Sequence, residues 1–326
     1  MTQARTILAA AAVTAAAGIA WGVVEANAFT TRRVTVPVLP PGAAPVRVLH
    51  LSDLHLTPHQ ERRIAWVRSL ARENVDLVVN TGDNLAHAEA VPAVTRALTP
   101  LLELPGVFVY GSNDYYGPTP LNPFKYFAGP SELEPARPAL PTHALTAVLE
   151  GVGWTNLNNA RAELTVGGHD LSFVGMDDPH IQRDAMPADD GVRGDLHIGV
   201  VHAPYRRALD ALHRDGAALT LAGHTHGGQV CVPGFGALVT NCDIDRARVK
   251  GLHGYPGARP DAGGGASGDA GAEAVGDESM WLHVSAGLGT SPYAPVRFAC
   301  RPEATVLTLV PRALGAVRFP SPGRIF

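Results

Sequence analysis

Apolar residues are densest at the N-terminus of the chain, where residues 7–24 contain no charged side chain. A run of this length lies near the lower limit for a helix that crosses a bilayer. Arg5 precedes the run, and Arg32 and Arg33 follow it. An uncleaved membrane anchor, a signal peptide and a buried Ala-rich helix all fit this pattern. Because terminal apolar runs with flanking arginines usually meet a membrane, we favour an anchor or a signal segment for residues 1–30.

The sequence Ala26-Asn27-Ala28 offers small residues of the kind that precede a signal-peptide cleavage site. Cleavage after Ala28 would release a secreted protein, whereas an intact run would anchor the chain in a membrane. Positive charges are nearly balanced on the two sides of the run, so they give little information on its orientation. We expect an anchored chain whose folded domain lies outside the cytoplasm.

Beyond a Pro-rich segment that predicts a linker over 31–45, short apolar runs alternate with stretches of helical periodicity. The expected strands are 46–53, 75–81, 107–110, 171–176, 196–202, 219–222, 281–285 and 305–310. The expected helices are 61–73, 90–102 and 205–214. This alternation at short intervals predicts an α/β layered core within a domain that covers 46–326.

Two segments interrupt the alternating pattern. Residues 117–141 contain several prolines and no periodicity, which predicts a lid or rim loop. Residues 261–279 consist mostly of Gly, Ala and acidic residues, which predicts a disordered insertion because such a composition cannot form a packed core. Without that insertion and the N-terminal segment, about 270 residues remain, which fits one large domain better than two.

Composition narrows the classes of function. Of the 326 residues, 46% are hydrophobic and 17% are charged, which excludes a mainly disordered chain. The formal net charge of −4 provides no basic field for nucleic acid, so we expect no nucleic-acid partner. The 3 cysteines have no close spacing and favour buried thiols over a disulfide framework or a zinc ribbon. The unusual number is that of histidine, which occurs 14 times against 7 for Tyr.

Polar residues able to bind a metal or to act in catalysis follow five of the expected strands. They are Asp53 and His55, Asp83, Asn113, His202, and the pair His224 and His226. Residues two apart in an extended segment point to the same side, and α/β sheets place their ligands at the carboxyl ends of strands. We therefore expect these side chains to meet at one edge of the sheet.

The mixture of carboxylates, imidazoles and an amide indicates a metal site. Mixed nitrogen and oxygen ligands suit Mn, Fe or Zn better than Ca, and we favour Mn. The candidate ligands are too many for one ion, so the set predicts two divalent ions that share a bridging group. Ion pairs of this kind lower the pKa of a trapped water and support in-line displacement at phosphorus.

The order of these motifs resembles that of the calcineurin-like metallophosphoesterases. The matching elements are Asp-Leu-His at 53–55, Gly-Asp-Asn at 82–84, Gly-Ser-Asn-Asp at 111–114, the single His202, and Gly-His-Thr-His at 223–226. The chain is most similar to the membrane-anchored bacterial branch, which shares Ser-Asp-Leu-His, Gly-His-Thr-His-Gly-Gly-Gln and the Arg-Pro-Glu of 301–303. The resemblance implies a four-layer α/β/β/α sandwich, here preceded by an apolar helix.

The resemblance also implies roles for the candidate residues. The Asp and His of 53–55 and His226 would hold one ion, Asp83 would bridge to the second, and His202 and His224 would complete the ligands of the second. A hydroxide bridging the ions would then hydrolyse a phosphomonoester, phosphodiester or pyrophosphate bond. Given the N-terminal helix, we expect a lipid-linked or envelope substrate and a monomeric enzyme. The alternative is a metal-bearing binding protein or degenerate enzyme at the membrane, with weak or no hydrolase activity.

The third motif departs from the family pattern of Gly-Asn-His followed by an acid. Ser112 stands in the place of the metal-binding Asn, and Asn113 in the place of the catalytic His. Either the loop shifts by one residue, so that Asn113 supplies a ligand oxygen, or Asn113 occupies the catalytic position and the second ion is held more weakly. We favour the first. His180, after Asp177-Asp178-Pro179, either replaces the missing acid or belongs to a polar turn, and we favour the turn.

Overall fold

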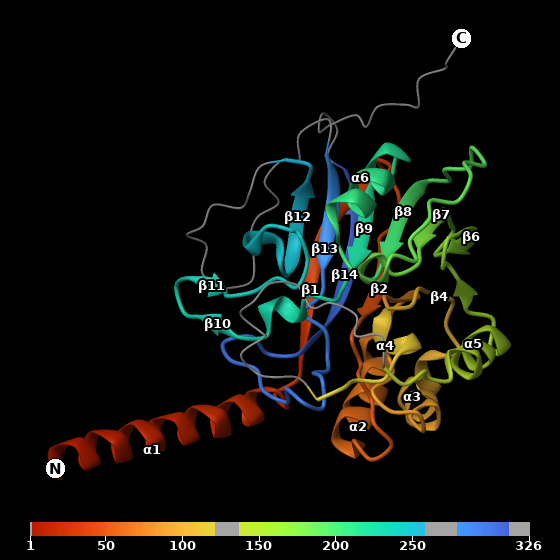
Figure 1. Cartoon of the computed structure of the whole chain (residues 1–326). Helices are drawn as coiled ribbons and strands as arrows, with labels where there is room; N and C mark the ends of the chain where they lie inside the picture. The colour runs from red at the N-terminus through yellow and green to blue at the C-terminus, as the bar shows by residue number, and fades with distance from the viewer. Residues whose placement is uncertain (1, 121–136, 258–278, 313–326) are drawn as a thin grey trace.

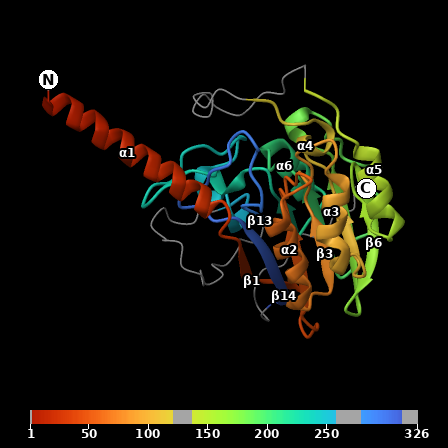
Figure 2. The same ribbon diagram turned by 90° about the horizontal axis from the view of Figure 1, so that it is seen from below.

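The computed structural model describes residues 2–120, 137–257 and 279–312 (Figure 1). Helix α1 (Thr2–Glu25) projects away from the body that holds the other described elements, as Figure 2 also shows. Within α1, Arg5–Glu25 is long and apolar enough to cross a membrane. Most of the expected rim loop, and all of the expected insertion except Ser279, lie outside the described residues.

Two six-stranded sheets form the centre of the body. The first runs in the order β1 (Thr30–Leu39), β14 (Glu303–Pro311), β2 (Val46–Leu51), β3 (Leu77–Asn80), β4 (Gly106–Phe108) and β5 (Thr155–Asn156). The second runs in the order β12 (Gly251–Tyr255), β13 (Met280–Val284), β9 (Leu219–Ala222), β8 (Leu196–Val201), β7 (His169–Met176) and β6 (Ala160–Val166). Neighbouring strands are parallel at the centre of the second sheet, and from β2 to β5 in the first.

Helices cover the outer face of each sheet. Helices α2 (Glu61–Ser69), α3 (Val91–Leu98) and α5 (Thr142–Gly151) pack on the first sheet, and α6 (Arg206–Arg214) packs on the second (Figure 1). Between the sheets, apolar side chains such as Val79, Val107 and Val200 share one core. The layers are therefore α/β/β/α, which confirms the predicted four-layer sandwich.

Short elements complete the body, and several of them lie where strands end. They are η1 (Leu70–Glu73), η2 (Thr99–Leu101), α4 (Ser112–Tyr115), η4 (Pro179–Ile181), η5 (His226–Gly228), β10 (Cys231–Val232), β11 (Gly236–Ala237) and η6 (Arg246–Arg248). Each of the strands and helices predicted from periodicity is present within a few residues of its expected bounds. The prediction succeeds because the central parallel strands are buried on both faces and therefore appear as continuous apolar runs.

The expected linker over 31–45 is wrong for its first part, because Thr30–Leu39 form strand β1. This strand pairs in parallel with β14, beginning with Thr30 opposite Glu303. Val36 and Val38 are buried. Since β1 is an edge strand of its sheet, Pro37 needs no hydrogen-bonding partner on the outer side, and prolines are tolerated in edge strands. The prolines made this segment appear to be a connector, although its apolar residues alternate as in a strand.

Candidate metal centre

The segments that follow the central strands are joined by main-chain hydrogen bonds at the carboxyl edge of the two sheets. The main-chain nitrogen of His55 donates to the carbonyl oxygen of Asp83 at 2.9 Å. The nitrogen of Gly223 donates to the carbonyl oxygen of His202 at 2.8 Å. The backbone by itself thus holds the predicted site segments side by side.

Candidate ligands meet in two overlapping groups of three. One group is Asp53, His55 and His226, the other is Asp53, Asp83 and His202, and the potential ligand atoms of each group lie within 4.8 Å of one another. Oδ2 of Asp83 lies 3.4 Å from Nε2 of His55 and 3.4 Å from Nε2 of His202. Asp83 therefore lies between the two groups, which is where the resemblance implies a bridging carboxylate.

His224 lies beside these groups rather than within them. Its ring centroid is 5.2 Å from that of His202. Its main-chain nitrogen donates to Oδ2 of Asp53 at 3.1 Å. The structure thus gathers six of the seven predicted residues around Asp53 and Asp83, and Asn113 joins them through a contact described below. Their roles as ligands stay a prediction.

Backbone conformation distinguishes the same residues. The φ angles of Asp53, His55, Asp83, His224 and His226 lie between 40° and 68°, in the left-handed region that residues with a Cβ rarely adopt. Each such residue costs on the order of 1–3 kcal/mol, and strain of this kind concentrates at functional sites. The concentration of left-handed residues here, which sequence reasoning had no means to detect, is independent support for a functional cluster.

Only one of the two carboxylate oxygens of Asp53 accepts hydrogen bonds among the described residues. Its Oδ2 accepts hydrogen bonds from Oγ of Ser52 at 2.5 Å and from the main chain of His224. Its Oδ1 is buried and has no hydrogen-bond partner among the described residues, while Nε2 of His226 lies 3.5 Å away. A buried carboxylate oxygen without a donor is costly. A cation beside Oδ1 would remove that cost, so the donor set fits a metal ion.

Main-chain carbonyl groups orient the imidazole rings. Nδ1 of His202 lies 2.6 Å from the carbonyl oxygen of Thr81, and Nδ1 of His226 lies 3.1 Å from that of Gly289. Because a carbonyl oxygen only accepts, Nδ1 of His202 must carry a proton, so Nε2 is the nitrogen of this ring that can serve as a ligand once it has lost its own proton. In both residues Nε2 is the atom that faces the carboxylates. A contact of this kind sets the tautomer and the ring orientation of metal-binding histidines.

Burial keeps most of these imidazoles neutral. It lowers the pKa of His55 to about 4 and holds the pKa values of His224 and His226 well below the usual range. His202 differs. Burial alone would lower its pKa too, but the charge of Asp83 and the contact with its carboxylate outweigh burial, so the pKa of His202 stands well above its usual value. In the metal-free protein at neutral pH, His202 is therefore the protonated member of the cluster.

We expect Mn²⁺ binding to release about one proton near neutral pH, because Nε2 of His202 must lose its proton to become a ligand. Affinity should therefore rise about tenfold per pH unit as long as the pH is below the pKa of His202. Isothermal titration calorimetry in two buffers of different ionisation enthalpy counts the protons released. In His202→Gln the number of protons released should fall by about one, and an unchanged number would contradict the assignment.

The side chain of Asn113 contacts Asp83 through nitrogen rather than oxygen. Its main-chain nitrogen donates to Oδ1 of Asp83 at 2.7 Å, and its Nδ2 donates to Oδ2 at 2.8 Å. Its Oδ1 accepts from Nη2 of Arg137 at 2.7 Å. Ligation of a metal ion through Oδ1, the alternative favoured from the sequence, would require the amide to turn over and leave Arg137. Sequence reasoning did not identify Arg137, which lies near the end of the expected rim loop and belongs to no motif.

Asp114 and Gly111 shape the loop that carries Asn113. Asp114 is fully buried, and its carboxylate accepts from the main-chain nitrogens of Asp83 at 2.7 Å, Asn84 at 2.8 Å and Gly111 at 3.1 Å. It therefore fastens the second motif to the third. A Cβ at Gly111 would overlap Oδ1 of Asp83 and lie 2.5 Å from Nε2 of His202. Only glycine fits this position.

His180 lies against the candidate ligand His224, with ring centroids 4.7 Å apart. Its Nδ1 lies 3.0 Å from the hydroxyl of Tyr205. The polar turn favoured from the sequence is present as well, since Oδ1 of Asp178 accepts from the main-chain nitrogen of His180 at 2.9 Å. Burial lowers the pKa of His180 to about 4 and raises that of Asp178 to about 7. The turn thus places the imidazole of His180 beside the site, and this imidazole is neutral at neutral pH.

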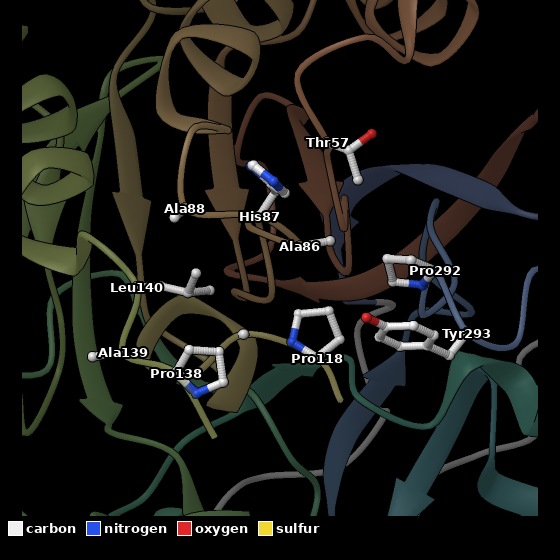
Figure 3. A pocket seen from close by; sticks show the side chains of 11 residues that line it. Thr57, Ala86, His87, Ala88, Pro118, Pro138, Ala139, Leu140, Pro292 and Tyr293 are labelled. Atoms are coloured by element: carbon white, nitrogen blue, oxygen red, sulfur yellow. The ribbon is translucent and has the colours of Figure 1, made fainter. Parts of the chain in front are cut away.

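A cavity of about 290 Å³ opens at the same edge of the fold (Figure 3). Its lining includes Thr57, Ala86 and Pro118, which lie a few residues after three of the motifs, and Pro138, Leu140 and Tyr293, which come from two other loops. Figure 3 shows Tyr293 and Pro292 on one side of the opening and Leu140 and Pro138 on the other. The lining is mainly apolar, unlike the neighbouring cluster of carboxylates and imidazoles.

Two packed sheets between helices, with carboxylates and imidazoles buried together at the strand ends, are the architecture of a metallophosphoesterase. Residues 46–228 match the family described as calcineurin-like phosphoesterase, and the chain belongs to that family. The family predicted from the motif order is confirmed. The protein is a phosphoric ester hydrolase of a family that typically binds two divalent metal ions, and the described residues include two candidate metal-ligand groups.

Relatives in Bacillus subtilis (strain 168) are similar over most of their length. The uncharacterized metallophosphoesterase YkoQ is 25% identical over 273 residues, which are 81% of this chain and 84% of YkoQ. The uncharacterized metallophosphoesterase YkuE is 24% identical over 320 residues, 93% of each chain. Among solved structures, the protein TT1561 of Thermus thermophilus is 14% identical with a TM-score of 0.38, over 75% of this chain and 91% of that one.

Proposed function

We propose that this metallophosphoesterase is anchored in a membrane and uses two divalent ions, with Mn favoured, on a lipid-linked or envelope substrate. The bond it hydrolyses is a phosphomonoester, a phosphodiester or a pyrophosphate. The observation that carries the proposal is the carboxylate of Asp53, which belongs to both groups of candidate ligands and has a buried oxygen with no partner among the described residues. Two overlapping ligand groups, with Oδ2 of Asp83 lying 3.4 Å from an imidazole nitrogen of each, suit a pair of neighbouring ions that share a bridging carboxylate.

Under this proposal, some residues would bind the two metal ions and others would orient those ligands. Asp53, His55 and His226 would hold one ion, His202 and His224 would hold the other, and Asp83 would be shared by both. Two such ions, when bound, lower the pKa of a water between them and offset the charge of phosphoryl oxygens. Asn113 orients the carboxylate of Asp83 by donating two hydrogen bonds to it. The carbonyl oxygen of Thr81 orients the ring of His202 by accepting a hydrogen bond from Nδ1.

The third motif lacks the histidine that would protonate a leaving group, and the cationic side chain of Arg137 contacts its replacement Asn113. A guanidinium keeps its charge at all physiological pH values, so it binds phosphoryl oxygens well but does not act as an acid. Arg137 is held in place by the carbonyl oxygens of Gly117 and Tyr116, each at 2.8 Å. We therefore propose that the enzyme prefers esters with good leaving groups.

The last turn of α1 supports an uncleaved anchor over a signal peptide. The side chain of Glu25 is 7% exposed, and its carboxylate accepts from the main-chain nitrogens of Ala299 at 3.1 Å and Cys300 at 2.7 Å. The nitrogen of Arg297 donates to the carbonyl oxygen of Gly22 at 3.0 Å. Cleavage after Ala28 would remove all three hydrogen bonds. An alkaline phosphatase fused to the C-terminus, active only when exported, tests whether the catalytic domain lies outside the cytoplasm.

The proposed activity is tested with the full chain in detergent micelles. Supplied with Mn²⁺, it should release 4-nitrophenol from 4-nitrophenyl phosphate, from bis(4-nitrophenyl) phosphate, or from both. Metal analysis of the same preparation should find about two ions per chain. Chelation by EDTA should abolish turnover, and added Mn²⁺ should restore it. A chain that holds two ions but hydrolyses no member of a panel of monoesters, diesters and pyrophosphates would contradict the proposal.

A second candidate function is a metal-bearing binding protein, or a degenerate enzyme with weak turnover, at the membrane. The observation that favours it is the orientation of Asn113, whose Oδ1 faces Arg137 instead of the metal groups. This candidate expects one bound ion or none, and no hydrolysis of any ester in the panel. Two ions together with turnover would eliminate it.

A further inference from the structure

Some of the residues that line the cavity of Figure 3 lie only a few positions after candidate metal ligands in the sequence. Thr57 follows His55 within the same loop, and Ala86 follows Asp83 in the next one. These two loops run side by side, because the main-chain nitrogen of Ala86 donates to the carbonyl oxygen of Leu56 at 2.9 Å. The walls of the cavity are therefore extensions of the loops that carry the candidate ligands.

The opposite side of the cavity is lined by segments that follow residues in contact with the candidate ligands. The carbonyl oxygen of Gly289 contacts the ring of His226, and the segment that follows it carries Pro292 and Tyr293 into the lining. Pro138 lies directly after Arg137, which contacts Asn113. The segments that line the cavity thus continue from residues that contact the candidate ligands His226 and Asn113.

The chemistry of the lining selects an apolar occupant. No Asp, Glu, Lys or Arg is among the described residues that line the cavity, and most of those residues are alanine, proline or leucine, with Thr57, His87 and Tyr293 as the residues with polar side chains. Its volume of about 290 Å³ is just below the usual range of small-molecule sites, roughly 300–1,000 Å³. That size suits part of a substrate, such as one chain or ring, rather than a whole molecule.

The end of α1 lies on the same side of the molecule as this cavity. The segment from Pro292 to Arg297 lines the cavity at its beginning and holds α1 at its end, where the nitrogen of Arg297 donates to the carbonyl oxygen of Gly22. Figure 1 and Figure 2 both show the loop after β13 against the C-terminal end of α1. Tyr293 at the opening is 51% exposed. An apolar chain that leaves a membrane beside α1 would find the cavity close by.

We propose that this cavity is the binding subsite for an aliphatic chain of the substrate, carried by an alcohol that is esterified to the phosphoryl group at the metal centre. The substrate class is then a phosphoester of a long-chain alcohol or lipid. The inference rests on the proposed function for the position of the phosphoryl group. The apolar lining and the location of the cavity define the subsite itself.

Bulky residues placed in the cavity test this subsite. Ala88 and Ala139 line it and are exposed, so Ala88→Trp and Ala139→Trp should fill it without disturbing the core. Ala147→Trp on the exposed face of α5, outside the lining, is the matched control. The full chain in nanodiscs with Mn²⁺ is assayed with methyl and octyl 4-nitrophenyl phosphate, which share one leaving group.

We expect the unaltered chain and Ala147→Trp to prefer the octyl ester by at least about tenfold in kcat/KM. Each cavity variant should lose most of that preference and keep its kcat/KM for the methyl ester within about twofold. Partition of octyl esters into the nanodisc is the same for all variants, so it cannot produce this difference. Turnover of both esters without a chain-length preference, or a preference that survives both variants, would overturn the subsite.

Binding separates failure of the subsite from failure of the proposed function. Calorimetry with octyl phosphate and methyl phosphate, on the same Mn²⁺-supplied preparations, requires no turnover. Tighter binding of octyl phosphate that Ala139→Trp removes would support the subsite even in a chain that hydrolyses neither ester, and in that case only the proposed activity fails. Equal binding of the two phosphates, or binding of neither, would overturn the subsite.

Discussion

Asp83→Asn is expected to lower kcat/KM for 4-nitrophenyl esters by at least about 100-fold. Oδ2 of Asp83 lies 3.4 Å from imidazole nitrogens of both candidate metal groups, so this one substitution removes negative charge from the space between them. Loss of that charge should also reduce the number of bound ions, which metal analysis of the purified variant measures. The amide has nearly the same shape as the carboxylate, so packing should be preserved.

A matched carboxylate away from the centre controls for the loss of charge. Asp195 has a side chain that is 46% exposed and lies 3.8 Å from His169. Asp195→Asn should leave kcat/KM and metal content within about twofold of the unaltered chain. If Asp83→Asn retains full activity with two ions bound, Asp83 does not bridge them and the proposed arrangement of ligands is wrong.

Gly111→Ala is expected to lower kcat/KM by a similar factor, through a steric clash rather than through loss of charge. The added methyl group would overlap Oδ1 of Asp83 and lie 2.5 Å from Nε2 of His202, so these two side chains must separate. We expect loss of at least one of the two ions and a fall in kcat/KM of about 100-fold or more. No candidate ligand changes its chemistry, so the result tests the geometry of the cluster rather than its composition.

Gly151→Ala is the control for this substitution. A Cβ at Gly151, at the end of α5, would meet no atom within 4 Å. It should leave metal content and kcat/KM unchanged, and circular dichroism should show that both variants fold. If Gly111→Ala keeps both ions and full activity, the close approach of Asp83 and His202 to residue 111 is not needed for metal binding.

The sequence was sufficient for the positions of the candidate site, but not for its local geometry. Polar residues directly after apolar strands predict a cluster, because parallel strands bring their carboxyl ends to one edge. Asp53 and His226 illustrate this, because they are far apart in the chain and yet Oδ1 of one lies 3.5 Å from Nε2 of the other. The left-handed backbone of five candidate ligands could not be predicted, because Asp and His have no intrinsic preference strong enough to reveal it.

Other features escaped prediction because they depend on tertiary contacts. Prolines concealed β1, whose position at the edge of the sheet makes Pro37 tolerable. Arg137 belongs to a segment without periodicity, and only the folded chain brings it to Asn113. The orientation of the Asn113 amide follows from that contact, so no motif comparison could have shown which of its atoms faces Asp83.

The connection between α1 and β1 is short, which matters if α1 is the proposed membrane anchor. Only residues 26–29 separate the two elements, and Glu25 is bonded to the segment that follows β13. With α1 in a bilayer, the metal centre would keep a constant height and tilt above the headgroups. Substrates would then arrive by lateral diffusion within the adjacent leaflet. Turnover would follow their surface density in that leaflet rather than their concentration in the surrounding solution.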